Sequence, residues 1–137
     1  MAACPFCAIV AGDGEDADVV YRGDAAVAFL DHRPLFPGHV LVVPTRHVDT
    51  LPDLDLADVA PFFSVVQRVS AAVPKALGAQ GTFVAMNNVV SQSVRHLHVH
   101  VVPRTKGDGL RGFFWPRRKY AAGEAASVAD RIRRALA

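Results

Sequence analysis

Three histidines alternate with apolar residues in the segment His96-Leu97-His98-Val99-His100. Because successive side chains of a β-strand point to opposite faces, a strand here places the three imidazoles on one face, about 6.6 Å apart, and the apolar residues on the other. The chain has six histidines, so half of them share this face. Exposed strand faces ordinarily carry Thr, Lys and Glu, and the pattern therefore indicates a chemical site.

Two chemistries fit three neighbouring imidazoles. They could bind one metal ion, as in three-histidine catalytic zinc sites, or one neutral imidazole could attack an electrophile while its neighbours fix its tautomer. Neutral ring nitrogens attack phosphorus well, and the resulting phosphoimidazole is a good leaving group. Uncharged donors for phosphate oxygens precede the histidines at Asn87, Asn88, Gln92 and Ser93, and such donors favour the nucleophilic alternative.

The two cysteines of the chain, Cys4 and Cys7, are separated by two residues. This spacing is typical of half a zinc site, of a redox motif or of two buried apolar residues. A redox motif of the thioredoxin type follows a strand in a βαβ unit, whereas this pair lies three residues from the start of the sequence. The zinc and packing interpretations are therefore favoured over the redox one.

The elements that must position these residues follow from the apolar pattern. β-branched runs bounded by Gly, Pro and Asp predict strands over 19–22, 25–31, 39–44, 82–86 and 94–102. Gly23-Asp24 predicts a hairpin between the first two strands.

Helical signals occur in two places. A cap pattern at Thr50-Leu51-Pro52-Asp53 begins a helical periodicity that continues to Leu77. Pro61 and Pro74 within it predict a kink or a break. A shorter helix is expected over Ala125–Leu136. One long helix among hairpin-linked strands predicts an α+β fold.

Composition and charge exclude several classes of protein. With 137 residues, 51% hydrophobic and 20% charged, we expect one folded domain rather than a disordered chain. Residues 1–94 hold five basic and ten acidic residues, and residues 95–137 hold ten and three. Long basic runs are absent, so binding to a nucleic-acid duplex is not expected. Neither a membrane span nor a signal peptide is expected, which predicts a cytoplasmic protein.

Two motifs carry a resemblance to a known family. The segment 93–102 matches His-x-His-x-His followed by two apolar residues, and Asp31-His32-Arg33-Pro34 with Pro37-Gly38-His39-Val40-Leu41-Val42 forms the second motif. The chain thereby resembles the histidine triad (HIT) superfamily of nucleotide hydrolases and transferases from Cys4 to about Arg104. The motifs are most similar to the fragile-histidine-triad branch and to the bacterial zinc-containing branch.

The resemblance implies a five-stranded antiparallel sheet with one long helix, in a homodimer. It implies that His98 is the nucleophile and forms a nucleotidyl-histidine intermediate. His96, His100 and His39 match the histidines that support it, and Ser93 matches a residue that contacts phosphate and steers the leaving group.

The resemblance also implies the contacts to a purine nucleotide or dinucleotide. Asp31 matches the carboxylate that binds the ribose hydroxyls, which is chemically sensible because a carboxylate accepts from both. The remaining expected substrate contacts line the base pocket or face the phosphates: Phe6, Ile9, Phe29, His32, Asn87 or Asn88, and Gln92. The loop before Gln92 is shorter than in most members, so either asparagine could occupy the matching position.

A structural zinc ion is implied by a further resemblance. Many bacterial HIT proteins carry a Cys-x-x-Cys pair and bind zinc, and the related galactose-1-phosphate uridylyltransferases use two cysteines and two histidines. The matching residues here are Cys4, Cys7, His47 and His96, which would form a closed tetrahedral site. In that case His96 serves as a ligand instead of a hydrogen-bonding member of the triad.

The chain is expected to divide into a HIT domain, residues 1–106, and a C-terminal extension, residues 107–137, packed on the same domain. In one branch of the superfamily a C-terminal Trp-Pro segment reaches the partner's active site. Trp115-Pro116 could do the same or could pack on the protein's own sheet.

We therefore expect a hydrolase or transferase that cleaves at the α-phosphorus of a nucleoside 5′-phosphate derivative, either a dinucleoside polyphosphate or a phosphoramidate. One alternative is a nucleotide-binding sensor or scaffold with little turnover. A metalloenzyme that uses all three triad histidines is the other, and the cysteine pair argues against it because it offers zinc a better site.

Overall fold

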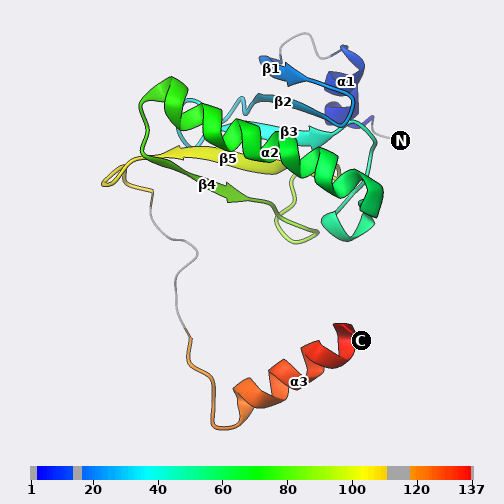
Figure 1. The fold of residues 1–137 in the computed structure, drawn as a ribbon, viewed down its shortest axis with the longest axis vertical. Coiled ribbons are helices and arrows are strands. Elements are labelled where there is room, and N and C mark those ends of the chain that lie inside the picture. Colours follow the sequence, from blue (N-terminus) through cyan, green and yellow to red (C-terminus); the bar gives the residue numbers. More distant parts are fainter. Residues whose placement is uncertain (1–2, 14–16, 111–117, 137) are drawn as a thin grey trace.

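The computed structural model describes residues 3–13, 17–110 and 118–136. A five-stranded antiparallel sheet in the order β1-β2-β3-β5-β4 forms its centre (Figure 1). The strands are β1 Val19–Arg22, β2 Ala26–Leu30, β3 Val40–Pro44, β4 Gly81–Ala85 and β5 Val99–Arg104. The predicted α+β fold and five-stranded sheet are confirmed.

Four of the predicted strands lie within one residue of their expected bounds, and the fifth does not. The strand expected over 94–102 begins only at Val99. Before it, Leu97 donates its N–H to the carbonyl of Val48, 2.8 Å away, instead of to a strand. The His98 ring bonds to the carbonyl of His96, 2.8 Å away. These two hydrogen bonds take the place of pairing with a neighbouring strand, so His96 and His98 precede β5.

The long helix α2, Leu56–Leu77, lies across one face of the sheet (Figure 1). A 3₁₀ turn over Leu51–Asp53 precedes it, and the Asp53 carboxylate accepts from both the N–H and the hydroxyl of Thr50. The predicted cap is confirmed. The predicted break at a proline is wrong: α2 continues through Pro61 and Pro74, and the interruption lies between the 3₁₀ turn and α2.

The sheet separates two apolar clusters because its side chains alternate. On the α2 face, Val99 and Val101 of β5 pack with Leu97 and with helix side chains such as Phe62. By length and composition α2 could also cross a membrane, but burial of this face accounts for its apolar residues. The opposite face holds a smaller cluster built from Phe6, Val27, Phe29, Leu41 and Val43.

A short helix, α1 Pro5–Ala11, supplies Phe6 to the smaller cluster. The sequence analysis did not predict it, although Pro5 at the first turn and Gly12 with φ 87° at the end are usual helix boundaries. Arg22 of β1 donates to the carbonyls of Ile9 and Val10. These bonds fix the end of α1 to the sheet.

The C-terminal helix α3, Glu124–Leu136, is present as predicted. The expected packing of the extension on the domain stays a prediction, and Trp115-Pro116 lies outside the described residues.

Gly38 ends the turn that leads into β3, and its φ of 96° is one that L side chains rarely adopt. An added Cβ would also meet the side chain of Leu77. We expect Gly38→Ala to lower the free energy of unfolding by about 1–2 kcal/mol, measured by urea denaturation. Gly81→Ala is the matched control, because Gly81 has neither a positive φ nor an atom within 4 Å of the added Cβ. Equal effects of the two substitutions would contradict this account.

Candidate functional site

The end of β2 and the start of β3 place Asp31 beside His39. The two strands are antiparallel, and the Asp31 N–H donates to the His39 carbonyl, 2.9 Å away. The Asp31 carboxylate accepts from the N–H of Arg33 at 2.9 Å and lies 3.7 Å from Nε2 of His39. The Asp31 carboxylate therefore lies beside the buried His39 ring, and 17% of the Asp31 side chain is exposed.

A backbone donor fixes the tautomer of His39. The N–H of Leu35 donates to Nδ1 of His39 at 3.0 Å, so the proton of the neutral ring is on Nε2. Nε2 of His39 lies 2.9 Å from Nδ1 of His100. His100 is held at this place because it pairs with Leu41 in the register of β3 and β5. His39 therefore donates to His100, and the proton of His100 is on its own Nε2.

His98 has the opposite tautomer. Its Nδ1 lies 2.8 Å from the carbonyl oxygen of His96, which can only accept, so Nδ1 carries the proton and Nε2 has a free lone pair. The His98 ring is 3% exposed and packs edge-on against Phe6 and His100, each with ring centroids 5.1 Å apart. These contacts hold an unprotonated nitrogen in a defined direction.

Burial keeps the His39 and His100 rings neutral. It lowers the pKa of His100 to about 4, with a smaller contribution in the same direction from His98 and His39. Burial also lowers the pKa of His39, although the nearby Asp31 carboxylate opposes the effect. At pH 7 the His39 and His100 rings are therefore neutral, which the hydrogen bonds from Leu35 to His39 and from His39 to His100 require.

The structure brings most of the expected base-pocket residues together. Phe6 and Phe29 are buried with ring centroids 5.3 Å apart, and Ile9 packs against the same cluster. His32 is placed differently, because its side chain is 89% exposed with Nδ1 4.0 Å from Asp31.

The expected phosphate donors lie in the loop before the histidines, where most of their polar groups bind backbone. Asn88 accepts from the N–H of Leu51, and Asn87 donates to the carbonyl of Ser91. Gln92 accepts from the N–H of Val89 and donates to the carbonyl of Asp49. These side chains therefore shape the loop.

Ser93, like Asn87 and Asn88, is exposed. It borders a cavity of about 420 Å³ that is also lined by Cys4, His47 and Asp49. The structure therefore places it beside the cysteines.

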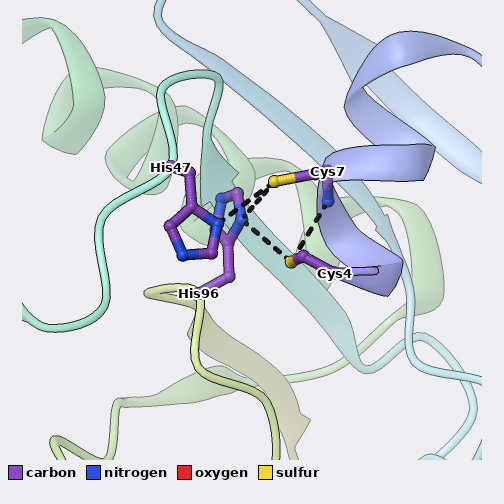
Figure 2. A group of neighbouring side chains, drawn as sticks. All are labelled: Cys4, Cys7, His47 and His96. Atoms are coloured by element: carbon purple, nitrogen blue, oxygen red, sulfur yellow. Dashed lines mark hydrogen bonds between the residues drawn. The ribbon is translucent and has the colours of Figure 1, made fainter. Parts of the chain in front are cut away.

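Cys4, Cys7, His47 and His96 form one cluster, with all four donor atoms within 4.8 Å of one another (Figure 2). Nδ1 of His96 lies 3.5 Å from each sulfur, and Nδ1 of His47 lies 3.1 Å from Sγ of Cys7. Helix α1 presents both sulfurs, because Cys4 is its N-cap and Cys7 lies in its first turn.

The tautomers of the two histidines suit a cation at the centre of this cluster. Nε2 of His96 donates to the Pro44 carbonyl at 2.9 Å, and Nε2 of His47 donates to the Asp49 carboxylate at 3.0 Å. Both rings therefore direct an unprotonated Nδ1 inward, held by the outer contacts usual for metal ligands. Two sulfurs and two imidazoles match the donor set of a structural zinc site.

The same contacts argue against one metal bound by all three triad histidines. Both ring nitrogens of His96 face other groups, namely the cysteine sulfurs and the carbonyl of Pro44. No nitrogen of His96 is left for a metal shared with His98 and His100.

Several contacts of the candidate site could not be predicted from the sequence. The Leu35 N–H and the Pro44 carbonyl are backbone groups, which no residue type reveals. Asp49 could have been found, because it follows His47 by two residues and carboxylates commonly orient histidine ligands.

Three curated relatives have names that state an activity. A bis(5′-nucleosyl)-tetraphosphatase of Schizosaccharomyces pombe is 36% identical over 67% of this chain, which spans about half (52%) of the relative. An adenosine 5′-monophosphoramidase of the same yeast is 30% identical over 94% of this chain and 95% of its own. An adenylylsulfatase of Arabidopsis thaliana is 34% identical over 78% of this chain and 55% of its own.

Solved structures show the same fold over nearly the whole chain. A HIT-family protein from Bacillus subtilis has a TM-score of 0.89 at 30% identity, covering 99% of both chains. A zinc-bound histidine triad protein from Mycobacterium smegmatis has a TM-score of 0.74 at 35% identity, covering 97% of both. The family model of the HIT domain matches residues 13–107, and with these relatives it shows that the chain belongs to the HIT family.

Proposed function

We propose that this protein is a nucleotide hydrolase or transferase that cleaves at the α-phosphorus of a nucleoside 5′-phosphate derivative. The observation that carries the proposal is the free Nε2 lone pair of His98, in a ring oriented by the His96 carbonyl and kept 3% exposed. The three relatives named for a tetraphosphatase, a phosphoramidase and an adenylylsulfatase support it, because each name describes a nucleotide substrate.

The reaction follows from the two tautomers. Nε2 of His98 attacks the α-phosphorus, so a nitrogen–phosphorus bond forms while the bond to the leaving group breaks. His100 keeps its Nε2 proton because His39 donates to its Nδ1, and that N–H stabilises charge on a phosphate oxygen. Ser93 steers the leaving group. Attack by water on the nucleotidyl-histidine then releases the mononucleotide and restores His98.

Substrate contacts are assigned to the surrounding residues. Asp31 accepts from the ribose hydroxyls, and the apolar surface of Phe6, Ile9 and Phe29, with His32 at its edge, takes the base. Gln92, together with Asn87 or Asn88, shapes the loop that faces the phosphates.

A zinc ion in the cysteine–histidine cluster is part of the proposal. Burial and the neighbouring Cys4 thiol raise the pKa of Cys7, whereas a central cation would favour the thiolate form of a cysteine ligand. The zinc-bound neighbour from Mycobacterium smegmatis supports this assignment. The metal would cross-link α1, the loop after β3 and His96, and it takes no part in the reaction.

We also infer a homodimer, joined through the β4 edge of the sheet. β4 ends the strand order opposite β1, and Val84 within it is 44% exposed. An edge strand can pair with the same strand of a second copy.

His98→Asn is expected to lower kcat roughly 10³-fold or more, because the amide can donate to the His96 carbonyl but cannot attack phosphorus. Hydrolysis of an adenosine phosphoramidate and of diadenosine tetraphosphate would be measured, with nucleotide affinity by calorimetry as the control. Mass spectrometry of quenched wild-type protein should show a nucleotidyl adduct that the variant lacks. Full activity of His98→Asn would contradict the mechanism, and tight binding without turnover in wild type would favour the sensor alternative.

Protein purified without chelators is expected to hold about one zinc per chain by elemental analysis. Cys7→Ser should lower both the zinc content and the Tm, because serine is a poor zinc ligand. His32→Ala is the matched control, since this exposed histidine lies outside the cluster and should leave the zinc content unchanged. Metal-free wild-type protein with an unaltered Tm after chelation would refute the assignment.

Asp31→Ala is expected to weaken the binding of ribonucleotides by about 1.5–3 kcal/mol, the value of hydrogen bonds to a charged group. Deoxyribonucleotides, which lack one of the two hydroxyls, should lose less. Asp31→Asn serves as the second variant, because its oxygen still accepts from the Arg33 N–H and keeps the turn. Equal losses for both sugars would show that Asp31 acts only on the turn.

A further inference from the structure

Residues 47–51, which lead from β3 into the 3₁₀ turn, bond to two separate parts of the proposed site. At the start of this stretch, Nδ1 of His47 lies 3.1 Å from a cysteine sulfur of the cysteine–histidine cluster (Figure 2). At its end, the N–H of Leu51 donates to the side-chain oxygen of Asn88, 2.8 Å away. We call residues 47–51 the bridging segment, because they extend from the cluster to residues 87–92, the loop that faces the phosphates.

Within the bridging segment, Asp49 bonds in both directions. Its carboxylate accepts from Nε2 of His47 at 3.0 Å, which leaves the unprotonated Nδ1 of that ring directed at the cluster. Its backbone carbonyl accepts from the side-chain amide of Gln92. The oxygen of the same amide accepts from the N–H of Val89, 3.0 Å away. A single residue therefore joins a candidate metal ligand to the middle of the loop.

The backbone of the loop needs support from outside. Val89 and Ser91 have φ values of 70° and 62°, in the left-handed region that residues other than glycine rarely adopt and that is an outlier for a β-branched residue such as Val89. Backbone in such conformations persists where the surrounding structure holds it. The bonds from the Gln92 and Asn88 side chains to the bridging segment supply this support. The loop therefore depends on the bridging segment for its shape.

The bridging segment, in turn, gains from a metal ion at its start. The side chains of His47 and Asp49 are 40% and 45% exposed, and a bond between exposed side chains holds a segment only weakly. A zinc ion bound to Nδ1 would fix the His47 ring, and the carboxylate that orients this ring would be fixed with it. Order at the cluster would then extend along the bridging segment to the loop.

We propose that Asp49 is a positioning residue that couples the zinc ion to the loop that faces the phosphates. Its carboxylate fixes His47 as a ligand, and its carbonyl fixes Gln92. Zinc binding thereby orders the loop, and by thermodynamic linkage an ordered loop strengthens zinc binding by the same factor. The proposal rests on the proposed zinc ion and on the proposed function of the loop, and it gives the metal no part in the reaction.

Zinc affinity and hydrogen exchange test the role of the carboxylate. Asp49→Ala should raise the zinc dissociation constant, measured by competition with a chelator, by about 10- to 100-fold. Amides of residues 87–92 should exchange about tenfold faster in Asp49→Ala and in zinc-free wild type than in zinc-loaded wild type. Asp49→Asn is the conservative variant, because its amide oxygen still accepts from His47, and it should restore both quantities. Equal effects of the two substitutions, or a loop whose exchange is unaffected by zinc removal, would overturn the proposal.

Gln92→Ala tests the carbonyl side of the coupling. It removes the bond to the Asp49 carbonyl and leaves every proposed zinc ligand in place, yet linkage requires weaker zinc binding, by about tenfold, and faster exchange of the loop. Gln80→Ala is the matched control, since the Gln80 amide also accepts from a backbone N–H, that of Lys106, but lies at the opposite end of β4 from the loop. It should change neither quantity. An unchanged zinc dissociation constant in Gln92→Ala would overturn the coupling.

Hydrolysis assays report the proposed function separately. An inactive protein whose zinc affinity and loop exchange change together would support the coupling and refute the proposed function. An active protein in which the two quantities change independently would overturn the coupling and leave the proposed function intact. Wild-type protein that binds no zinc would overturn the coupling together with the zinc assignment.

Discussion

Both the cysteine–histidine cluster and the orientation of His98 depend on His96. Its ring is fully buried, with one nitrogen held by the Pro44 carbonyl and the other facing two sulfurs, and its backbone carbonyl holds the proton of His98. A shift of His96 would therefore disturb the cysteine–histidine cluster and the orientation of the nucleophile together. The cluster positions the catalytic segment where the strand ladder does not, because β5 begins only at Val99.

The order of hydrogen bonds at the histidines is imposed by backbone groups. The Leu35 N–H, which can only donate, fixes the His39–His100 pair, and the His96 carbonyl, which can only accept, fixes His98. The imidazoles therefore have one consistent arrangement when neutral, and burial keeps His39 and His100 neutral by lowering their pKa values. Protonating either ring on both nitrogens would place two N–H groups against each other or against the Leu35 donor, so the arrangement is self-consistent only in the neutral state.

Sequence patterns predicted what depends on side-chain type and missed what depends on backbone. Alternation in the histidine segment correctly placed Leu97, Val99 and Val101 in one core cluster. It overestimated the strand, because nothing in the residue types shows that His98 bonds to its own segment. The four members of the cysteine–histidine cluster came from a resemblance, and the structure brought them together. Helix α1 was not predicted because seven residues show little periodicity, although Pro5 and Gly12 are usual helix boundaries.

The two faces of the sheet have different roles. Stability is concentrated on the α2 face, where Val99 and Val101 pack with the helix, while His98 packs against Phe6 on the opposite face. The apolar groove along α2 belongs to the same core-bearing side. Substitutions in this groove can therefore alter packing with little effect on the tautomers of the triad, since the β-sheet itself lies between the groove and the face that carries the reacting nitrogen.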